Sequence, residues 1–171
     1  MRVQNTTLVS IEEYLSSSYE PDCDYVDGVL EERNLGEWNH SNLQTTISAY
    51  LKYRAKKWNV RVGVELRIRV SASRIRVQDI CVFLRDLELE QLPTKPPLVC
   101  IEVLSPEDRW PRVEKRIADF LAMGVERVWV FDPKKSEVFE YTKAGRRKVL
   151  DDLLKAPPVS IRISELIAEL D

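Results

Sequence analysis

Apolar positions recur along the chain with the periods of helices and strands. Over residues 39–58 they repeat at three- and four-residue spacing, which predicts the longest helix. Every second residue over 60–70 is apolar, which predicts a strand with a single apolar face. A turn at 71–74 then leads into an antiparallel strand at 75–84. Residues 98–104 are apolar at every position but one, which is typical of a strand buried on both faces.

Capping and turn residues predict the remaining elements. Ser10 and Glu13 form a capping box that begins a short helix extending to about residue 17. Asp27-Gly28 marks the turn of a hairpin over residues 24–33. The later elements are a helix over 111–123 that Gly124 ends, a strand at 127–131, a hairpin with strands at 137–141 and 147–150, and a helix at 165–170 capped by Ser164.

The order of these elements predicts the fold class. The helix at 111–123 connects two buried strands, so we expect those strands to be parallel. The connection over residues 85–97 has room for one helical turn. Together the elements predict an α/β protein in which helices flank a mixed β-sheet, organised as a single domain over residues 1–171.

Composition limits the expected cellular location of the protein and the kinds of site that it can form. No apolar run is long enough to span a bilayer, and the N-terminus has no signal-peptide core, so we expect a cytoplasmic protein without membrane contact. Three cysteines, two of them in predicted strands, are interpreted as reduced core residues. His40 is the single histidine, which excludes a site with several histidine ligands.

Charge is nearly balanced overall but uneven along the chain. The formal net charge of −2 gives no indication of nucleic-acid binding. Residues 52–76, however, hold nine lysines and arginines against one acid, Glu65, and a second basic group occupies 146–148. This pattern predicts either a surface for a phosphate backbone or the solvated outer face of a helix and a hairpin.

Two carboxylates interrupt the predicted buried strands. Glu102 is the polar exception in the strand at 98–104, and Asp79 lies in the strand at 75–84. A buried carboxylate is costly unless it is protonated, paired or bound to a cation. The pair therefore indicates either a divalent metal site or a structural pair compensated by arginines such as Arg67 or Arg76.

Two further residues have alternative interpretations. Glu65 either pairs with an arginine or belongs to the same acidic site as Asp79. His40, in the first turn of the predicted long helix, is either a surface or capping histidine or a functional residue.

Several short motifs stand in a recognisable order, namely Asp24-Tyr-Val-Asp-Gly28, His40, Arg76-Val-Gln-Asp79, Glu102-Val-Leu-Ser-Pro106 and the segment 124–133. On these motifs the chain resembles a bacterial family described as "putative restriction endonuclease", a branch of the PD-(D/E)XK nuclease superfamily. The resemblance implies a restriction-endonuclease-like fold and a Mg²⁺-dependent endonuclease, with Mn²⁺ as an alternative ion. It also implies a nucleic-acid substrate, DNA in the first place, and a homodimer.

The resemblance also implies roles for particular residues. Asp79 and Glu102 would hold the metal, and the backbone carbonyl of Val103 would be a further ligand. Hard oxygen ligands of this kind suit Mg²⁺. Gln78 replaces the proline that usually precedes the aspartate, which affects backbone rigidity more than ligand chemistry.

A second departure concerns the catalytic cation. Leu104 stands where the superfamily has a lysine, and in this family the lysine moves to the following helix, four residues before an aromatic. That spacing points to Arg116, with Lys115 beside it. At 100° per residue, Arg116 lies on the flank of the apolar stripe, whereas Lys115 points into solvent. Arginine stabilises charge but does not readily act as a base, so a requirement for lysine would leave the chain slow or inactive.

Alternatives to this assignment remain. Glu114 and Arg116 could form a surface pair. Taken together, the resemblance and the residue patterns give six candidate catalytic residues: Asp79, Glu102, Arg116, Lys115, Glu65 and His40. Two rival functions use the same fold: a nucleic-acid-binding module that does not cut, or a protein-interaction domain that uses the hairpin at 137–150. Added salt weakens the first kind of contact steeply and leaves an apolar interface unchanged.

Overall fold

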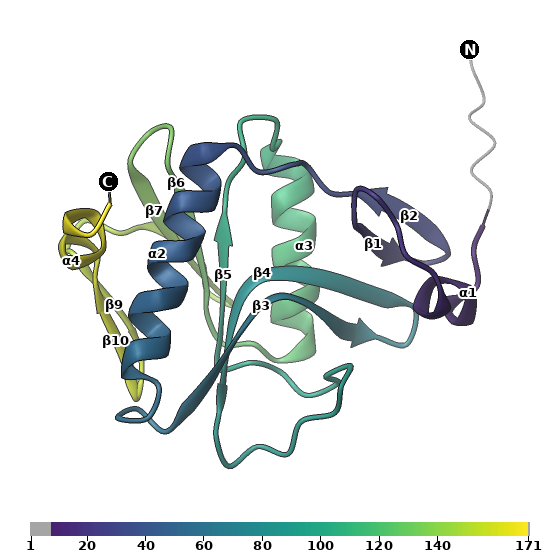
Figure 1. Ribbon diagram of the computed structural model, residues 1–171, viewed down its shortest axis with the longest axis horizontal. Coiled ribbons are helices and arrows are strands. Elements are labelled where there is room, and N and C mark those ends of the chain that lie inside the picture. Colours follow the sequence, from purple (N-terminus) through teal and green to yellow (C-terminus); the bar gives the residue numbers. More distant parts are fainter. Residues whose placement is uncertain (1–7, 171) are drawn as a thin grey trace.

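A mixed β-sheet lies at the centre of the computed structural model, which describes residues 8–170 (Figure 1). Its eight strands are β1 (Cys23–Val26), β2 (Val29–Glu32), β3 (Val60–Ser71), β4 (Arg74–Leu84), β5 (Val99–Val103), β6 (Val128–Asp132), β7 (Glu137–Thr142) and β8 (Gly145–Lys148). Their order is β2-β1-β4-β5-β6-β7-β8, and β3 pairs with β4. β5 and β6 are parallel, as the crossover predicted, and the α/β class is confirmed.

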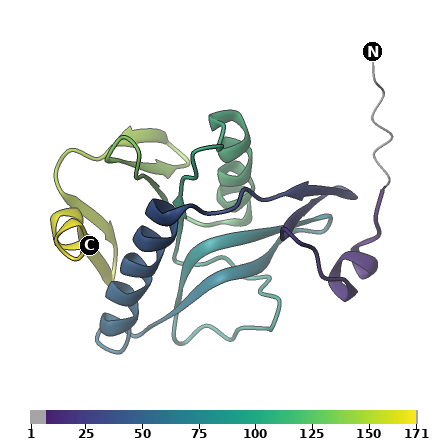
Figure 2. The same ribbon diagram turned by 45° about the horizontal axis from the view of Figure 1, so that its top comes forward.

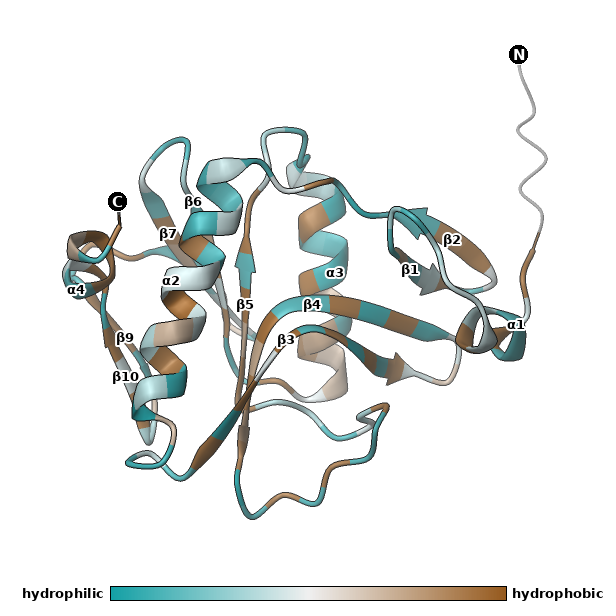
Figure 3. Cartoon of the chain, viewed as in Figure 1, coloured by the Kyte–Doolittle hydropathy of each residue, from teal (hydrophilic) through white to brown (hydrophobic). Residues whose placement is uncertain are grey.

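Two helices cover opposite faces of this sheet (Figure 1). Helix α2 (Trp38–Arg54) packs Leu43, Ile47 and Leu51 against one face, in a cluster with Ile80 and Ile101. Helix α3 (Trp110–Met123) packs against the other face, in a cluster that contains the neighbouring residues Cys81 and Cys100. Consecutive residues of β4 and β5 therefore serve different faces, and Figure 3 shows the resulting bands of hydropathy along β4.

Smaller elements lie at the two ends of the molecule. Helix α1 (Ile11–Ser16) lies beside the β1–β2 hairpin, and Ser10 caps it by accepting the Glu13 N–H, as predicted. At the other end lie helix α4 (Ile163–Ala168) and a two-stranded hairpin of β9 (Leu153–Ala156) and β10 (Val159–Arg162). The sequence patterns did not predict this hairpin. The predicted cap at Ser164 is wrong, because its N–H and Oγ both donate to Asp152 and α4 begins at Ile163, two residues before the predicted start.

The prediction of one apolar face for residues 60–70 is also wrong. Val62 packs with the α2 cluster, whereas Leu66 and Ile68 pack with the α3 cluster, and Val64 between them is 51 % exposed. Glu65 has φ +46°, a left-handed backbone conformation that interrupts regular strand geometry. The side chains of β3 therefore change faces at Glu65. The connection over residues 85–97, which has room for one helical turn, contains no helix.

An opening in the sheet separates the two partners of β4. On the same side of β4, β1 pairs at Ile75 and β5 pairs from Ile80 onward, so residues 76–79 face neither strand. Side chains fill this opening: Asp24 accepts the Val77 N–H, and the side-chain amide of Gln78 donates to the Ile101 carbonyl. Figure 2 shows the long, curved β3–β4 pair extending from α2 toward the β1–β2 hairpin. Asp79 lies at the β5 end of this opening.

Two expectations from composition can be compared with the structure. Cys23, Cys81 and Cys100 are buried and free, as expected for reduced core residues. Among the described helices, none combines the length and the apolar character needed to cross a membrane.

Candidate active site

Asp79 is a buried carboxylate at the edge of the sheet opening and is 2 % exposed. Its Oδ1 accepts from Arg33 Nη2 at 2.5 Å, and its Oδ2 accepts the Val103 N–H at 2.9 Å and lies 3.7 Å from His40 Nε2. Burial opposes ionisation, but the nearby His40, the charges of Arg33 and Arg116 and the Val103 N–H lower the pKa of Asp79 to about 2. Asp79 is therefore a carboxylate at neutral pH.

Glu102 lies on the adjacent strand β5 and is fully buried. Its Oε2 accepts a hydrogen bond from Arg116, and its Oε1 has no hydrogen-bond partner within residues 8–170. Burial and the nearby charge of Asp79 raise the pKa of Glu102 to about 7, against the opposing effect of Arg116. Among the described residues, this buried carboxylate oxygen therefore has no donor to compensate it.

Arg116 reaches this site from α3. It is buried and ion-paired with Glu102, as its position on the flank of the apolar stripe predicted. Lys115 points outward, as expected: its side chain is 48 % exposed and contacts Glu31 at 2.8 Å. The alternative of a surface pair between Glu114 and Arg116 is wrong, because Arg116 is buried on the opposite side of that helix from solvent.

His40 is also buried, so its interpretation as a surface or capping residue is wrong. The imidazole Nε2 faces Asp79, and this close carboxylate raises the pKa of His40 although burial opposes the shift. Space for the ring depends on Gly36, since a Cβ on that residue would lie 2.6 Å from His40 Nδ1. The loop before α2 therefore passes so closely that only glycine fits there.

Arg33 belongs to the site and was missed in the sequence. It follows the last residue of β2, donates from Nη1 to the Val77 carbonyl, and places Nη2 3.5 Å from Glu65 Oε2 as well as on Asp79. Glu65 is half exposed and also accepts from Gln44 at 2.6 Å. The acid is thus both paired with an arginine and adjacent to Asp79.

The arginines that pair with Asp79 and Glu102 are not the ones that the sequence suggested. Arg67 pairs with Asp22 at 3.1 Å, and Arg76 pairs with Asp24 and Asp119. Arg33 and Arg116 instead compensate Asp79 and Glu102. The prediction of Arg67 or Arg76 in that role is therefore wrong.

The basic residues at 52–76 do not form one surface. Arg61 and Arg69 donate to backbone carbonyls, and Arg67, Arg74 and Arg76 pair with acids. The exposed lysines lie at the C-terminal end of α2, and Lys52 is twelve residues, about 18 Å, along the helix from His40. The lysines therefore lie far from Asp79.

A hard metal ion fits the residues of this site. The described part of the chain contains no cluster of three or more His, Cys, Asp or Glu side chains arranged to bind a metal. Mg²⁺ needs only one or two carboxylates, because it keeps several of its waters. Asp79 and Glu102 supply these, the unpartnered Glu102 Oε1 is suited to a cation, and a small polar cavity adjoins Asp79, Val103 and Arg116.

Comparisons with known proteins agree with this architecture. The model of the Uma2 family, described as "Putative restriction endonuclease", matches residues 11–170. No curated protein matched the chain. The crystal structure of a "putative nuclease belonging to DUF820" from Anabaena variabilis ATCC 29413 superposes with a TM-score of 0.81 at 23 % identity, covering 94 % of this chain and 98 % of that chain. At that identity, the superposition establishes the fold.

Proposed function

Because the chain belongs to the Uma2 family of restriction-endonuclease-like proteins, we propose that it is a Mg²⁺-dependent endonuclease that hydrolyses phosphodiester bonds of DNA, with Mn²⁺ as an alternative ion. The observation that carries this proposal is the convergence of Asp79 and Glu102 beside Arg116, with a buried carboxylate oxygen that has no hydrogen-bond partner within the described part of the chain. The pattern combines acids for a hard cation with a fixed positive charge for a phosphate.

Asp79 and Glu102 would hold the metal, with the backbone carbonyl of Val103 as a further ligand. The bound ion would neutralise phosphate charge and acidify a water molecule. His40 orients Asp79 through its contact with Oδ2. Arg116 supplies positive charge where the phosphate gains negative charge, and it does not serve as a base.

The other candidate residues have outer positions. Glu65, half exposed, lies beside Arg33, so it influences the metal site through that arginine. Lys115 lies on the outer side of α3 with Glu31, where it contacts neither carboxylate. Cutting both strands of a duplex needs two sites, so a homodimer is part of the proposal.

Cleavage assays test this function. Supercoiled plasmid and single-stranded DNA are incubated with wild-type protein and either Mg²⁺ or Mn²⁺, in parallel with identically prepared Asp79→Asn and Glu102→Gln. Asp22→Asn is the matched control, since Asp22 pairs with Arg67 outside the site. Loss of cutting in both site variants, with the control active, supports the proposal. Equal cutting by all four proteins indicates contamination and contradicts it.

A second candidate is a nucleic-acid-binding module that does not cut. Arginine at position 116, in place of the lysine that the resemblance implies, favours it. The distinguishing result is wild-type protein that binds labelled DNA, with affinity falling steeply as salt is added, but leaves the DNA intact with either metal.

A further inference from the structure

We propose that Arg33 is an internal counter-cation of the metal site, which holds Asp79 Oδ1 and withdraws from it when a divalent cation binds. The inference rests on the proposed function, because it requires that Asp79 and Glu102 hold a metal. It assigns a role to a residue outside the motifs that carry the family resemblance.

The contacts of Asp79 show why Arg33 and a metal would compete. Oδ2 is already used by the Val103 N–H and faces His40, so Oδ1 is the oxygen with the greater freedom to bind an ion. Arg33 Nη2 lies on that oxygen at 2.5 Å, and the Arg33 side chain is only 12 % exposed. Glu102 differs, because its Oε1 is free of any hydrogen bond in the described structure. An ion bound by both carboxylates would therefore find Glu102 Oε1 accessible and Asp79 Oδ1 occupied by Arg33.

Charge balance leads to the same conclusion. The site brings together the acids Asp79, Glu102 and Glu65 with the guanidinium groups of Arg33 and Arg116. A divalent ion adds two positive charges within a few ångströms of Arg33, in a buried setting where repulsion is strong. Arginine does not lose its proton in proteins, so Arg33 relieves this repulsion only by moving.

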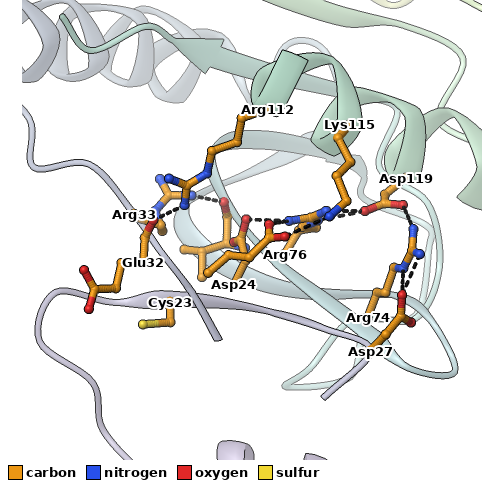
Figure 4. A network of polar contacts seen from close by, with 12 residues as sticks. Cys23, Asp24, Asp27, Glu32, Arg33, Arg74, Arg76, Arg112, Lys115 and Asp119 are labelled. Carbon is orange, nitrogen blue, oxygen red and sulfur yellow. Dashed lines mark hydrogen bonds and ion pairs between the residues drawn. The ribbon is translucent and has the colours of Figure 1, made fainter. Parts of the chain in front are cut away.

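The chain around Arg33 allows such a movement. Arg33 comes immediately after β2, and other contacts hold the hairpin in place (Figure 4). Arg76 pairs with Asp24 at 3.0 Å and with Glu31 at 2.8 Å, and Arg112 donates to the backbone carbonyl of Glu32. The guanidinium of Arg33 can therefore leave Asp79 while the hairpin stays anchored.

Calorimetric titration with Mg²⁺ and with Mn²⁺ tests the competition directly. We expect Arg33→Met to bind the ion about tenfold more tightly than wild type, which corresponds to about 1.4 kcal/mol. Arg112→Met is the matched control. It removes a neighbouring arginine that donates to the hairpin backbone at Glu32 but contacts neither Asp79 nor Glu102, so the metal affinity of this variant should equal that of wild type. Unchanged or weaker affinity in Arg33→Met would overturn the inference.

A second measurement follows the arginine side chains of wild-type protein, and a variant serves only to assign the signals. NMR of arginine side chains detects slow rotation of a guanidinium held by a carboxylate, and Arg33→Lys identifies the Arg33 signals. We expect rotation of the Arg33 guanidinium to become fast as Mg²⁺ saturates the protein. Signals that remain those of a held guanidinium at saturation would contradict the inference.

The site variants separate this inference from the function on which it rests. If Asp79→Asn and Glu102→Gln lose metal binding while Arg33→Met binds as wild type does, the role of Arg33 is wrong and the metal site stands. If both carboxylate variants bind metal as wild type does, the proposed metal site itself is wrong. Binding by Arg33→Met but not by wild type would support both.

Discussion

The Nε2 atom of His40 on α2 lies 3.7 Å from Oδ2 of Asp79 on β4, and both side chains are buried. This contact connects the first turn of a helix to the sheet opening in which the candidate active site lies. An imidazole next to a carboxylate gains stability in its charged form, and the pKa of His40 is raised accordingly.

The first prediction concerns the titration of His40. Because the chain has one histidine, a single set of imidazole NMR signals reports it. Without divalent cations, we expect the pKa of His40 to exceed the ordinary value of about 6.5 and to fall in Asp79→Asn. An unchanged pKa in Asp79→Asn would contradict the contact.

Linkage gives the same contact a pH-dependent effect on stability. The pKa of His40 is higher in the folded than in the unfolded protein, so the native state binds more protons in that range. The stabilisation is fully present below the unfolded pKa and is lost as pH rises through the folded pKa. Urea unfolding of wild type and His40→Gln at a series of pH values should show a difference that shrinks as pH rises.

The second prediction concerns Gly36. In Gly36→Ala the new Cβ would lie 2.6 Å from His40 Nδ1, so the ring or the loop must shift. We expect the pKa of His40 to move toward its ordinary value and DNA cleavage to decrease. Gly145→Ala, in the β7–β8 hairpin, is the control. A Cβ on Gly145 would meet nothing within 4 Å, and the positive φ of this residue adds a backbone strain that does not involve His40. Wild-type His40 titration in Gly36→Ala would show that the close approach is unimportant.

The third prediction concerns the buried pair of Arg116 and Glu102. Arg116→Met leaves the Glu102 carboxylate buried without its partner, and we expect the free energy of unfolding to fall by about 3–5 kcal/mol. Adding Glu102→Gln removes the uncompensated charge, so the double variant should lose less than the sum of the single losses. Urea unfolding of the four proteins measures this coupling. Additive losses would mean that the two side chains do not interact.

The fourth prediction concerns the ion network that anchors the β1–β2 hairpin (Figure 4). Arg76 is fully buried among Asp24, Glu31 and Asp119, so Arg76→Met should destabilise the protein by about 3–5 kcal/mol. Arg67→Met removes a partly exposed pair with Asp22 and should cost about 0–1 kcal/mol. Equal losses in the two variants, measured by urea unfolding, would refute the structural role of Arg76.

Local signals were sufficient for most of the fold. The Ser10 helix cap, the Asp27-Gly28 turn and the Gly124 helix end each depend on residues near in sequence, and each forms as predicted. The β9–β10 hairpin was missed because its strands have four residues each and Pro157-Pro158 stands between them, which gives too short a pattern to recognise. The change of faces in β3 depends on the backbone conformation of Glu65, which alternation alone does not reveal.

The candidate site was predictable only where a residue contradicts its surroundings. Asp79 and Glu102 stood out because a carboxylate is unexpected in an apolar strand, and helix geometry placed Arg116. Arg33 gave no such signal, because an arginine after a hairpin is ordinary and its partner Asp79 is 46 residues away. The roles of Asp79, Glu102 and Arg116 in metal binding and cleavage stay predictions.

The sheet opening has a further consequence for the order of events during synthesis. Its contacts join residues 14, 46 and 52 positions apart, in the pairs Arg116–Glu102, Arg33–Asp79 and Arg76–Asp24. Each of these contacts requires the chain between its two residues to close into a loop, which has an entropic cost. When β4 and β5 of a nascent chain have emerged from the ribosome and α3 has not, the emerged part contains both carboxylates but lacks Arg116. Competence to cut nucleic acid would therefore arise only once translation has passed α3 and the helix has docked.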